Sequence, residues 1–304
     1  MHSYGSKMKV AITGLGKAAW KYDLEMPEGR RSHTRSILEV SGFELVGGYD
    51  FNPNVAESWS KHFDLPIFRS FEEMINKCNP DLVVVAVPIE NLFSSLQDIL
   101  KFSTSIKVLV EKPVISSEEQ YSKLLEIEEV YKNRVLVNLP RLFAPETHEL
   151  AALLNSEGAG VPKISGTYSG SLLNTSLHFI TLLNYLKPNI FWVCNQFGDF
   201  SISIEIENEN LEIGRILYKP ERADSSFDFT LIEDKRKIDY MDGGYLIDFT
   251  NRGQVTTIKT SRDRYQENVY KYISEQGFKQ SLRIAGLFEI LPSLRGMLSN
   301  YEAT

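Results

Sequence analysis

Short apolar runs alternate with amphipathic stretches through the first half of the chain, and no other feature restricts the possible folds as much. The runs are rich in Val, Ile and Leu, which is typical of strands buried on both faces of a parallel sheet. They span residues 8–13, 43–49, 82–87, 108–110 and 135–138. The stretches between them have helical spacing and span residues 32–40, 55–62, 70–77, 91–102 and 117–131. This alternation predicts βαβ units wound into a doubly wound parallel sheet.

Beyond about Arg141 the pattern changes to short strands separated by Asn, Gly, Pro and Asp. The predicted strands span residues 163–169, 200–206, 211–218, 227–233, 237–240, 245–249 and 254–259. Helices are expected at residues 145–155, 177–186 and about 280–298. Such spacing is typical of an α+β domain with a large open, mainly antiparallel sheet. The 304 residues suit two domains, which we expect to span residues 1–142 and 143–304.

Composition and charge exclude several kinds of partner. Forty acidic against 33 basic residues give a formal charge of -7 without a Lys/Arg cluster, so we expect no nucleic-acid and no membrane partner. The longest apolar run, residues 82–89, is far shorter than the roughly 20 residues that span a bilayer. Cys78 and Cys194 have no metal-ligand spacing, so we expect no metal site and a cytoplasmic protein. The expected partner is a small molecule.

A glycine-rich turn directly follows the first predicted strand. Gly14-Leu-Gly-Lys-Ala-Ala19 matches the pattern G-x-G-x-x-A, in which the glycines allow a tight turn and a close approach to a pyrophosphate. An ordinary strand–helix turn is the alternative. We expect a dinucleotide to contact this segment through Thr13, Gly14, Leu15, Gly16, Lys17 and Ala19.

Asp50 ends the second predicted strand, where the ribose of a dinucleotide is recognised. Its carboxylate can accept hydrogen bonds from both ribose hydroxyls of NAD and would repel the 2′-phosphate of NADP, so NAD is the expected cofactor. Asp50 lies 34 residues after Gly16, where about 20 are usual, which indicates an insertion at residues 20–31. We interpret this insertion as a surface loop or, alternatively, as a lid over the active cleft.

The tripeptide Glu111-Lys112-Pro113 follows a predicted strand and therefore lies at the carboxyl edge of the sheet, where open α/β folds bind ligands. A lysine there can contact both the nicotinamide ribose and the reacting oxygen. Its charge favours the electron-rich oxygen during hydride transfer. A surface lysine before a turn-forming proline is the alternative.

These segments follow one another in an order typical of one superfamily, together with Val87-Pro88, Arg141-Leu-Phe-Ala-Pro145 and a downstream His178. Over nearly its whole length, the chain resembles the Gfo/Idh/MocA type of NAD(P)-dependent oxidoreductases, named after glucose-fructose oxidoreductase and inositol dehydrogenase. The resemblance implies a Rossmann domain followed by a substrate-binding and oligomerisation domain. It places Lys112 between nicotinamide and substrate, with His178 as general acid/base. It further implies that Val87 and Pro88 line the nicotinamide side, that Glu111 borders the cofactor and that Arg141 stands at the interdomain cleft.

Two positions near His178 depart from the family pattern. Asn174 and Thr181 stand where the family commonly has aspartates, four residues before the histidine and three after it. An asparagine can orient an imidazole but adds no negative charge to stabilise imidazolium. We expect Asn174 and His178 to contact the substrate, with weakened proton transfer. A purely structural His178 is the alternative.

We therefore expect an NAD-dependent oxidoreductase that transfers a hydride between nicotinamide and a hydroxyl or carbonyl carbon of a sugar, nucleotide sugar or cyclitol. One alternative is reduction of an imine or conjugated double bond. Another is a non-catalytic protein that binds the cofactor and senses a metabolite. Because an open sheet has a face that must be covered, we also expect a homo-oligomer.

Overall fold

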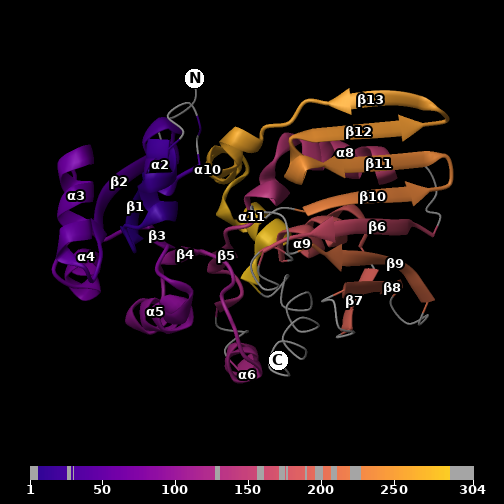
Figure 1. Cartoon of the computed structure of the whole chain (residues 1–304). Coiled ribbons are helices and arrows are strands. Elements are labelled where there is room, and N and C mark those ends of the chain that lie inside the picture. Colours follow the sequence, from indigo (N-terminus) through magenta and orange to yellow (C-terminus); the bar gives the residue numbers. More distant parts are fainter. Residues whose placement is uncertain are drawn as a thin grey trace. The chain divides into compact units, whose positions relative to one another are not determined.

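The computed structural model describes residues 6–25, 29, 31–126, 131–155, 161–170, 175, 177–188, 190–195, 201–206, 211–219 and 227–287. The chain forms two compact units (Figure 1). Unit 1 takes its described residues from Met1–Ile115, Lys123–Pro140 and Asp263–Glu289, and unit 2 takes its own from Ser116–Ser122 and Arg141–Arg262.

Unit 1 contains a parallel sheet with the strand order β2-β1-β3-β4-β5 (Figure 1). The strands are β1 (Met8–Thr13), β2 (Phe43–Tyr49), β3 (Leu82–Val85), β4 (Lys107–Val110) and β5 (Val135–Val137). The predicted doubly wound fold is confirmed, and the aliphatic residues of β3 and β5 are fully buried, as expected for strands covered on both faces. The strand order reverses between β1 and β3, and open α/β sheets bind ligands at such a reversal.

Helices follow the strands of unit 1 as the periodicity predicts: α2 (His33–Glu39), α3 (Pro53–Phe63), α4 (Phe71–Cys78), α5 (Ile89–Phe102) and α6 (Glu118–Glu126), the last shared between the two units. The interpretation of residues 20–31 as a loop is wrong for its first part, because the π-helix η1 (Lys17–Lys21) continues into α1 (Tyr22–Glu25). Trp20 and Asp23 are buried there, and the Asp23 carboxylate accepts hydrogen bonds from the main-chain N–H groups of Arg31 and Ser32. Residues 26–28 and 30 lie outside the described part.

Two helices near the end of the chain, α10 (Tyr265–Gln276) and α11 (Phe278–Ala285), belong to unit 1. From the sequence we expect these residues in the second domain, with one helix at about 280–298, so α10 is a helix that was not predicted. Gly277 separates the two helices, and its φ of +81° suits glycine. Residues 288–298 lie outside the described part. A bridge between Leu136 and Gly286 joins this segment to β5.

Unit 2 contains a sheet whose described strands have the order β13-β12-β11-β10-β6-β9-β8-β7 (Figure 1). The strands are β6 (Lys163–Tyr168), β7 (Ile190–Asn195), β8 (Ser201–Ile206), β9 (Leu211–Tyr218), β10 (Phe227–Glu233), β11 (Arg236–Met241), β12 (Leu246–Asn251) and β13 (Gln254–Ile258). Neighbouring strands are antiparallel except β6 and β9, so the mainly antiparallel sheet is confirmed. The expected segments are present, and β7 is an addition that the sequence analysis missed.

Helices α8 (Pro145–Asn155) and α9 (Leu177–Leu186) complete unit 2, after the short helix η2 (Pro140–Phe143). The ring of Phe179 on α9 lies 5.6 Å from that of Phe227 on β10. A buried ion cluster joins the ends of these elements, because Glu233 binds both Lys187, at 2.6 Å, and Arg236, at 2.8 Å. No helix in the described part of the chain is long and apolar enough to cross a membrane.

Candidate active site

The glycine turn after β1 lies where three strands of unit 1 meet. The Gly14 N–H donates to the carbonyl of Tyr49 on β2, and the Ala86 N–H after β3 donates to the carbonyl of Thr13, both at 2.8 Å. Gly14 has a φ of +84°, and a Cβ atom there would lie 2.5 Å from the carbonyl carbon of Ala86. A Cβ atom on Gly16, in contrast, would meet nothing within 4 Å. The first glycine thus allows the turn, and the second leaves an open approach to the backbone.

Leu15 anchors the turn in the core. Its side chain is fully buried, and a Cβ atom on Gly48 would lie 2.9 Å from one of its methyl groups. The Leu15 carbonyl accepts a hydrogen bond from the indole of Trp20 at 2.8 Å. Ala19 is fully buried too, while Lys17 is exposed. Because the Leu15 side chain is buried, only its main chain is available to a cofactor.

Asp50 is half-buried at the end of β2, and hydrogen bonds hold both of its carboxylate oxygens. Oδ2 accepts from the Leu15 N–H at 2.7 Å, and Oδ1 accepts from the Asn52 N–H at 2.8 Å. A carboxylate can accept about four hydrogen bonds, so each oxygen retains capacity for a ligand. The acid thus has a fixed orientation beside the glycine turn.

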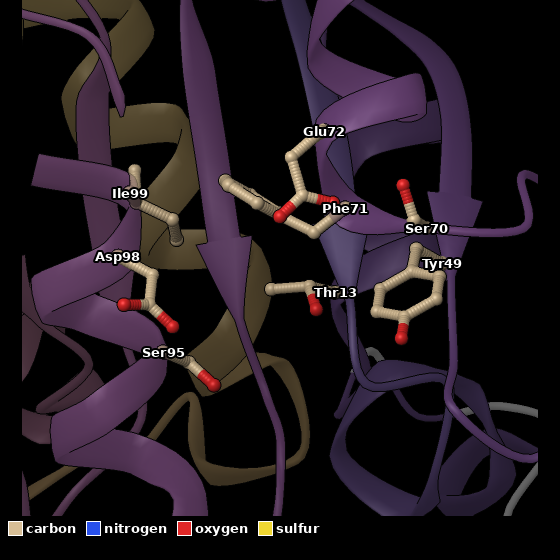
Figure 2. A pocket seen from close by; sticks show the side chains of 8 residues that line it. All are labelled: Thr13, Tyr49, Ser70, Phe71, Glu72, Ser95, Asp98 and Ile99. Carbon is tan, nitrogen blue, oxygen red and sulfur yellow. The ribbon is translucent and has the colours of Figure 1, made fainter. Parts of the chain in front are cut away.

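A pocket of about 340 Å³ opens at this point between the ends of β1, β2 and β3. It is lined by Thr13, Gly14, Tyr49, Asp50, Phe51, Val87, Pro88, Asn91, Ser94 and Ser95. A second pocket of about 250 Å³ shares Thr13, Tyr49 and Ser95 with it and continues to the start of α4. Figure 2 shows Ser95, Asp98 and Ile99 of α5 on one side of this second pocket, Tyr49 and Ser70 on the other, and Thr13 between them.

The two pockets have an acidic lining. Asp50, Glu72 and Asp98 contribute carboxylates, and no Lys or Arg is among the described residues that line either pocket. Hydrogen bonds from its own main-chain N–H and from Ser70 lower the pKa of Glu72, so this group is ionised at neutral pH. Such a lining suits hydroxyl and amino groups better than a phosphate.

Glu111 and Lys112 follow β4 at the same edge of the sheet. The Glu111 N–H donates to the Val85 carbonyl at 2.9 Å, and the Lys112–Pro113 peptide is cis. The Glu111 side chain is 17% exposed, and its Oε1 atom binds His33 at 2.9 Å and Asn138 at 2.7 Å. Burial alone would raise the pKa of Glu111, but the hydrogen bond from His33, the electrostatic effects of His33 and Lys112, and the hydrogen bond from Asn138 lower it below its ordinary value.

Sequence reasoning missed His33 and Asn138, as well as their partners Gln266 and Tyr270 on α10. The one available signal was the polar Asn138 at the end of an apolar strand. His33 gives no local signal, because its partner Tyr270 is 237 positions away in the chain.

Arg141 and His178 are described within unit 2. The Arg141 guanidinium lies 4.9 Å from the centre of the Phe227 ring. His178 is half-buried near the start of α9. The Thr181 hydroxyl donates to the carbonyl of Leu177 at 2.7 Å, so it bonds the main chain of its own helix. Asn174 lies outside the described residues, and no described cluster of His, Cys, Asp and Glu could hold a metal ion.

Residues 8–139 match the Gfo/Idh/MocA family, described as an oxidoreductase family with an NAD-binding Rossmann fold. The chain carries a Gfo/Idh/MocA Rossmann domain. The resemblance inferred from the motifs is thereby confirmed for this domain. The Gfo/Idh/MocA domain contains the glycine turn, Asp50, Val87-Pro88 and Glu111-Lys112.

Solved structures share the fold over almost the whole chain. A dehydrogenase (MviM) from Clostridium difficile has 16% identity and a TM-score of 0.73, with 98% of this chain and 99% of that chain covered. An inositol dehydrogenase homolog complexed with NAD+ from Azotobacter vinelandii has 15% identity and a TM-score of 0.74, covering 98% and 96%. A super-repressor mutant of Gal80p from Saccharomyces cerevisiae has 14% identity and a TM-score of 0.76, covering 98% and 96%. No curated protein matches the sequence significantly.

The residues of the Gfo/Idh/MocA domain fit a nicotinamide dinucleotide, NAD(P). The open space at Gly16 can admit a pyrophosphate, and the Asp50 carboxylate can accept hydrogen bonds from ribose hydroxyls beside the 340 Å³ pocket. The hydroxyls and carboxylates of the adjoining pocket provide acceptors for a base.

Proposed function

We propose that the chain is an NAD-dependent oxidoreductase that transfers a hydride between nicotinamide and a hydroxyl or carbonyl carbon of a sugar, nucleotide sugar or cyclitol. The observation that carries the proposal is the conjunction, at one edge of one sheet, of an open glycine turn, a fixed Asp50 and the Glu111-Lys112 pair. A turn that only joined a strand to a helix would need neither a fixed acid beside it nor the pocket that opens there.

Lys112 and His178 take separate parts in the proposed reaction. When bound, NAD supplies the nicotinamide carbon that accepts or donates the hydride. In the direction of oxidation, His178 takes the proton of the substrate hydroxyl while the Lys112 ammonium stabilises negative charge on that oxygen. In the direction of reduction the same groups act in reverse. Arg141 and Asn174 orient the substrate in this proposal.

NAD, rather than NADP, is the proposed cofactor. The 2′-phosphate of NADP would stand close to Asp50, with Glu72 and Asp98 also in the connected pockets and no described cation lining either of them. Arg31, at the end of the segment expected as an insertion, forms an ion pair with Asp263. The pocket lining therefore supports recognition of two free ribose hydroxyls.

A non-catalytic, metabolite-sensing role is the second candidate, and Thr181 is the observation that favours it. Its hydroxyl bonds the main chain of α9 and supplies no charge to His178. A sensor would need the fold that binds the cofactor, but it would not need residues that transfer a proton.

A two-step screen tests these proposals. Thermal unfolding is first followed with sugars, nucleotide sugars and cyclitols in the presence and absence of NAD, because a ligand that binds the folded state raises the melting temperature. Hits that need NAD are then tested for a change in absorbance at 340 nm. Turnover that is lost in Lys112→Ala and kept in Lys61→Ala, which removes an exposed lysine of α3, supports the oxidoreductase. Stabilising hits without turnover support the sensor.

A further inference from the structure

Trp20 is the first residue of the segment expected as an insertion, and it lies against the glycine turn in unit 1. Its indole N–H donates to the main-chain carbonyl of Leu15 at 2.8 Å, in a buried hydrogen bond. Its main-chain N–H donates to the carbonyl of Gly16 at 3.3 Å. Trp20 therefore holds both carbonyl groups in the middle of the turn, and the function proposed above does not account for these contacts.

Packing fixes the indole of Trp20 in this place. The residue is 6% exposed, and its ring lies 5.2 Å from that of His62 and 5.8 Å from that of Phe63, both on α3. Trp20 belongs to the π-helix η1, a rare conformation that is frequent at functional sites. Because the indole is held between α3 and the turn, its hydrogen bond can fix the orientation of the backbone at Leu15.

The peptide group between Leu15 and Gly16 transmits this orientation to the open side of the turn. A trans peptide group is planar, and its C=O and N–H point in opposite directions. Because the Leu15 carbonyl points to the buried indole, the Gly16 N–H points away from the core. A Cβ atom on Gly16 would meet nothing within 4 Å, and the Gly16 N–H donates to no atom in the part of the chain that the structure describes. A main-chain donor in such an open place suits a phosphate oxygen.

Asp50 fixes the preceding peptide group, because its Oδ2 atom accepts from the Leu15 N–H at 2.7 Å. The two peptide groups that flank Leu15 are thus each held by a side chain from another segment, Asp50 after β2 and Trp20 in η1. The Leu15 side chain is itself fully buried. The Gly16 N–H therefore has one direction before any ligand arrives, and a donor that is already oriented loses little conformational freedom on binding.

We propose that Trp20 is a positioning residue for the cofactor: its indole turns the Leu15 carbonyl inward and thereby directs the Gly16 N–H toward the pyrophosphate of the dinucleotide. The same bond keeps the partial negative charge of the carbonyl oxygen away from the phosphates. The inference rests on the proposed function, because it requires a dinucleotide at this turn. It also assigns the start of the expected insertion a role as a brace for the turn.

Trp20→Phe tests the proposal, because it removes the indole N–H and keeps an aromatic ring. Trp59→Phe is the matched control, since Trp59 is fully buried and its indole N–H donates to the Thr34 hydroxyl at 2.9 Å. Each variant loses one buried indole hydrogen bond, so the two melting temperatures should fall by similar amounts. The fluorescence of NADH should show a Kd raised about fivefold or more in Trp20→Phe, and within about twofold of the wild-type value in Trp59→Phe.

Ligands with and without phosphates separate positioning from a general loosening of the site. ADP-ribose, which carries the pyrophosphate, should lose affinity for Trp20→Phe to the same extent as NADH. Adenosine, measured by its competition with NADH, should bind Trp20→Phe as well as it binds the wild type, because it has no phosphate to meet the Gly16 N–H. Equal losses for adenosine and ADP-ribose would overturn the proposal, and so would unchanged NADH affinity in folded Trp20→Phe.

A measurement on the wild-type protein keeps the test independent of how Trp20→Phe folds. Donation from the Gly16 N–H to a phosphate polarises the shared peptide group, which makes the Leu15 carbonyl a stronger acceptor. The indole N–H proton resonance of Trp20 should therefore move downfield when NADH is added, while that of Trp59 stays in place. Trp59→Phe and Trp192→Phe assign these resonances by elimination.

An unmoved Trp20 resonance in protein saturated with NADH would overturn the role of Trp20 and leave the cofactor assignment intact. A wild-type protein that binds no NADH would overturn both. Hydride transfer is judged separately in the absorbance assay, so failure of the proposed oxidoreductase activity is distinguishable from failure of this inference.

Discussion

The Oδ2 atom of Asp50 accepts a hydrogen bond from the main-chain N–H of Leu15 at 2.7 Å, so the acid that ends β2 also braces the glycine turn that follows β1. One carboxylate thus connects the two segments of the proposed cofactor site. In that proposal, recognition of the ribose and placement of the pyrophosphate are coupled through this bond.

Replacing Asp50 should therefore weaken cofactor binding in two ways. Asp50→Ala removes the acceptor for the ribose and the brace on Leu15, and we expect the Kd for NADH to rise by about tenfold or more, since a hydrogen bond to a charged group contributes about 1.5–3 kcal/mol. NADH fluorescence measures this change. An unaltered Kd in a folded variant would mean that Asp50 does not contact the ribose.

Alanine substitution of the two glycines of the turn should have different effects on stability and on NADH binding. Gly14→Ala forces a Cβ atom into the backbone of Ala86 at a φ of +84°, so the free protein should lose stability by about 1–3 kcal/mol. In Gly16→Ala the added Cβ atom has no neighbour within 4 Å, so the melting temperature should stay close to that of the wild type. NADH affinity should fall, because the Cβ atom occupies the space through which the pyrophosphate approaches the backbone. Normal NADH binding by Gly16→Ala would contradict the assignment of the pyrophosphate to this turn.

Lys112 and His178 should contribute unequally to turnover. Lys112→Ala should lower kcat by about two orders of magnitude or more while NADH still binds. His178→Ala should have the smaller effect, because Thr181 supplies no charge and Asn174 stands where the family has an aspartate. Steady-state kinetics on the substrate found by the screen measure both, and full activity of Lys112→Ala would refute its role.

The pH dependence of stability should report on Glu111. Burial would raise its pKa, but the hydrogen bond from His33, the electrostatic effects of His33 and Lys112, and the hydrogen bond from Asn138 lower it below the ordinary value of 4.5. The stabilisation is therefore complete above the unfolded pKa and is lost as the pH falls through the lower folded pKa. The difference in free energy of unfolding between wild type and Glu111→Gln should shrink as the pH falls below about 4.5, as urea titrations can measure. A difference independent of pH would contradict the account.

Apolar patterning predicts much of the fold, because strands buried on both faces and helices with one buried face leave different periods in the sequence. The bounds of β1, β2, β9, β10, α8 and α9 agree with those predicted. Helix α10 escapes prediction altogether because Gln266, Glu267 and Asn268 are buried beside Val269, so its first turns show no contrast between an apolar and a polar face. The strand β7 is a continuous apolar run, which periodicity alone does not distinguish from a buried helix.

The candidate site is likewise predictable in part. The glycine turn, Asp50 and Glu111-Lys112 each stand at the end of an apolar strand, so the local sequence predicts that they lie at the edge of the sheet. The contacts of His33 with Glu111 and Tyr270 depend on packing between α2, β4 and α10, and no local pattern encodes such distant partners.

Calorimetric titration of the wild-type protein with NADH and with NADPH tests the central claim most directly. We predict one NADH site per chain and at least about tenfold weaker binding of NADPH, because the 2′-phosphate would meet the carboxylates of an acidic lining that contains no described cation. Equal or tighter binding of NADPH would show that Asp50 does not face the ribose. Absence of NADH binding would contradict the assignment of this edge of the sheet as a cofactor site.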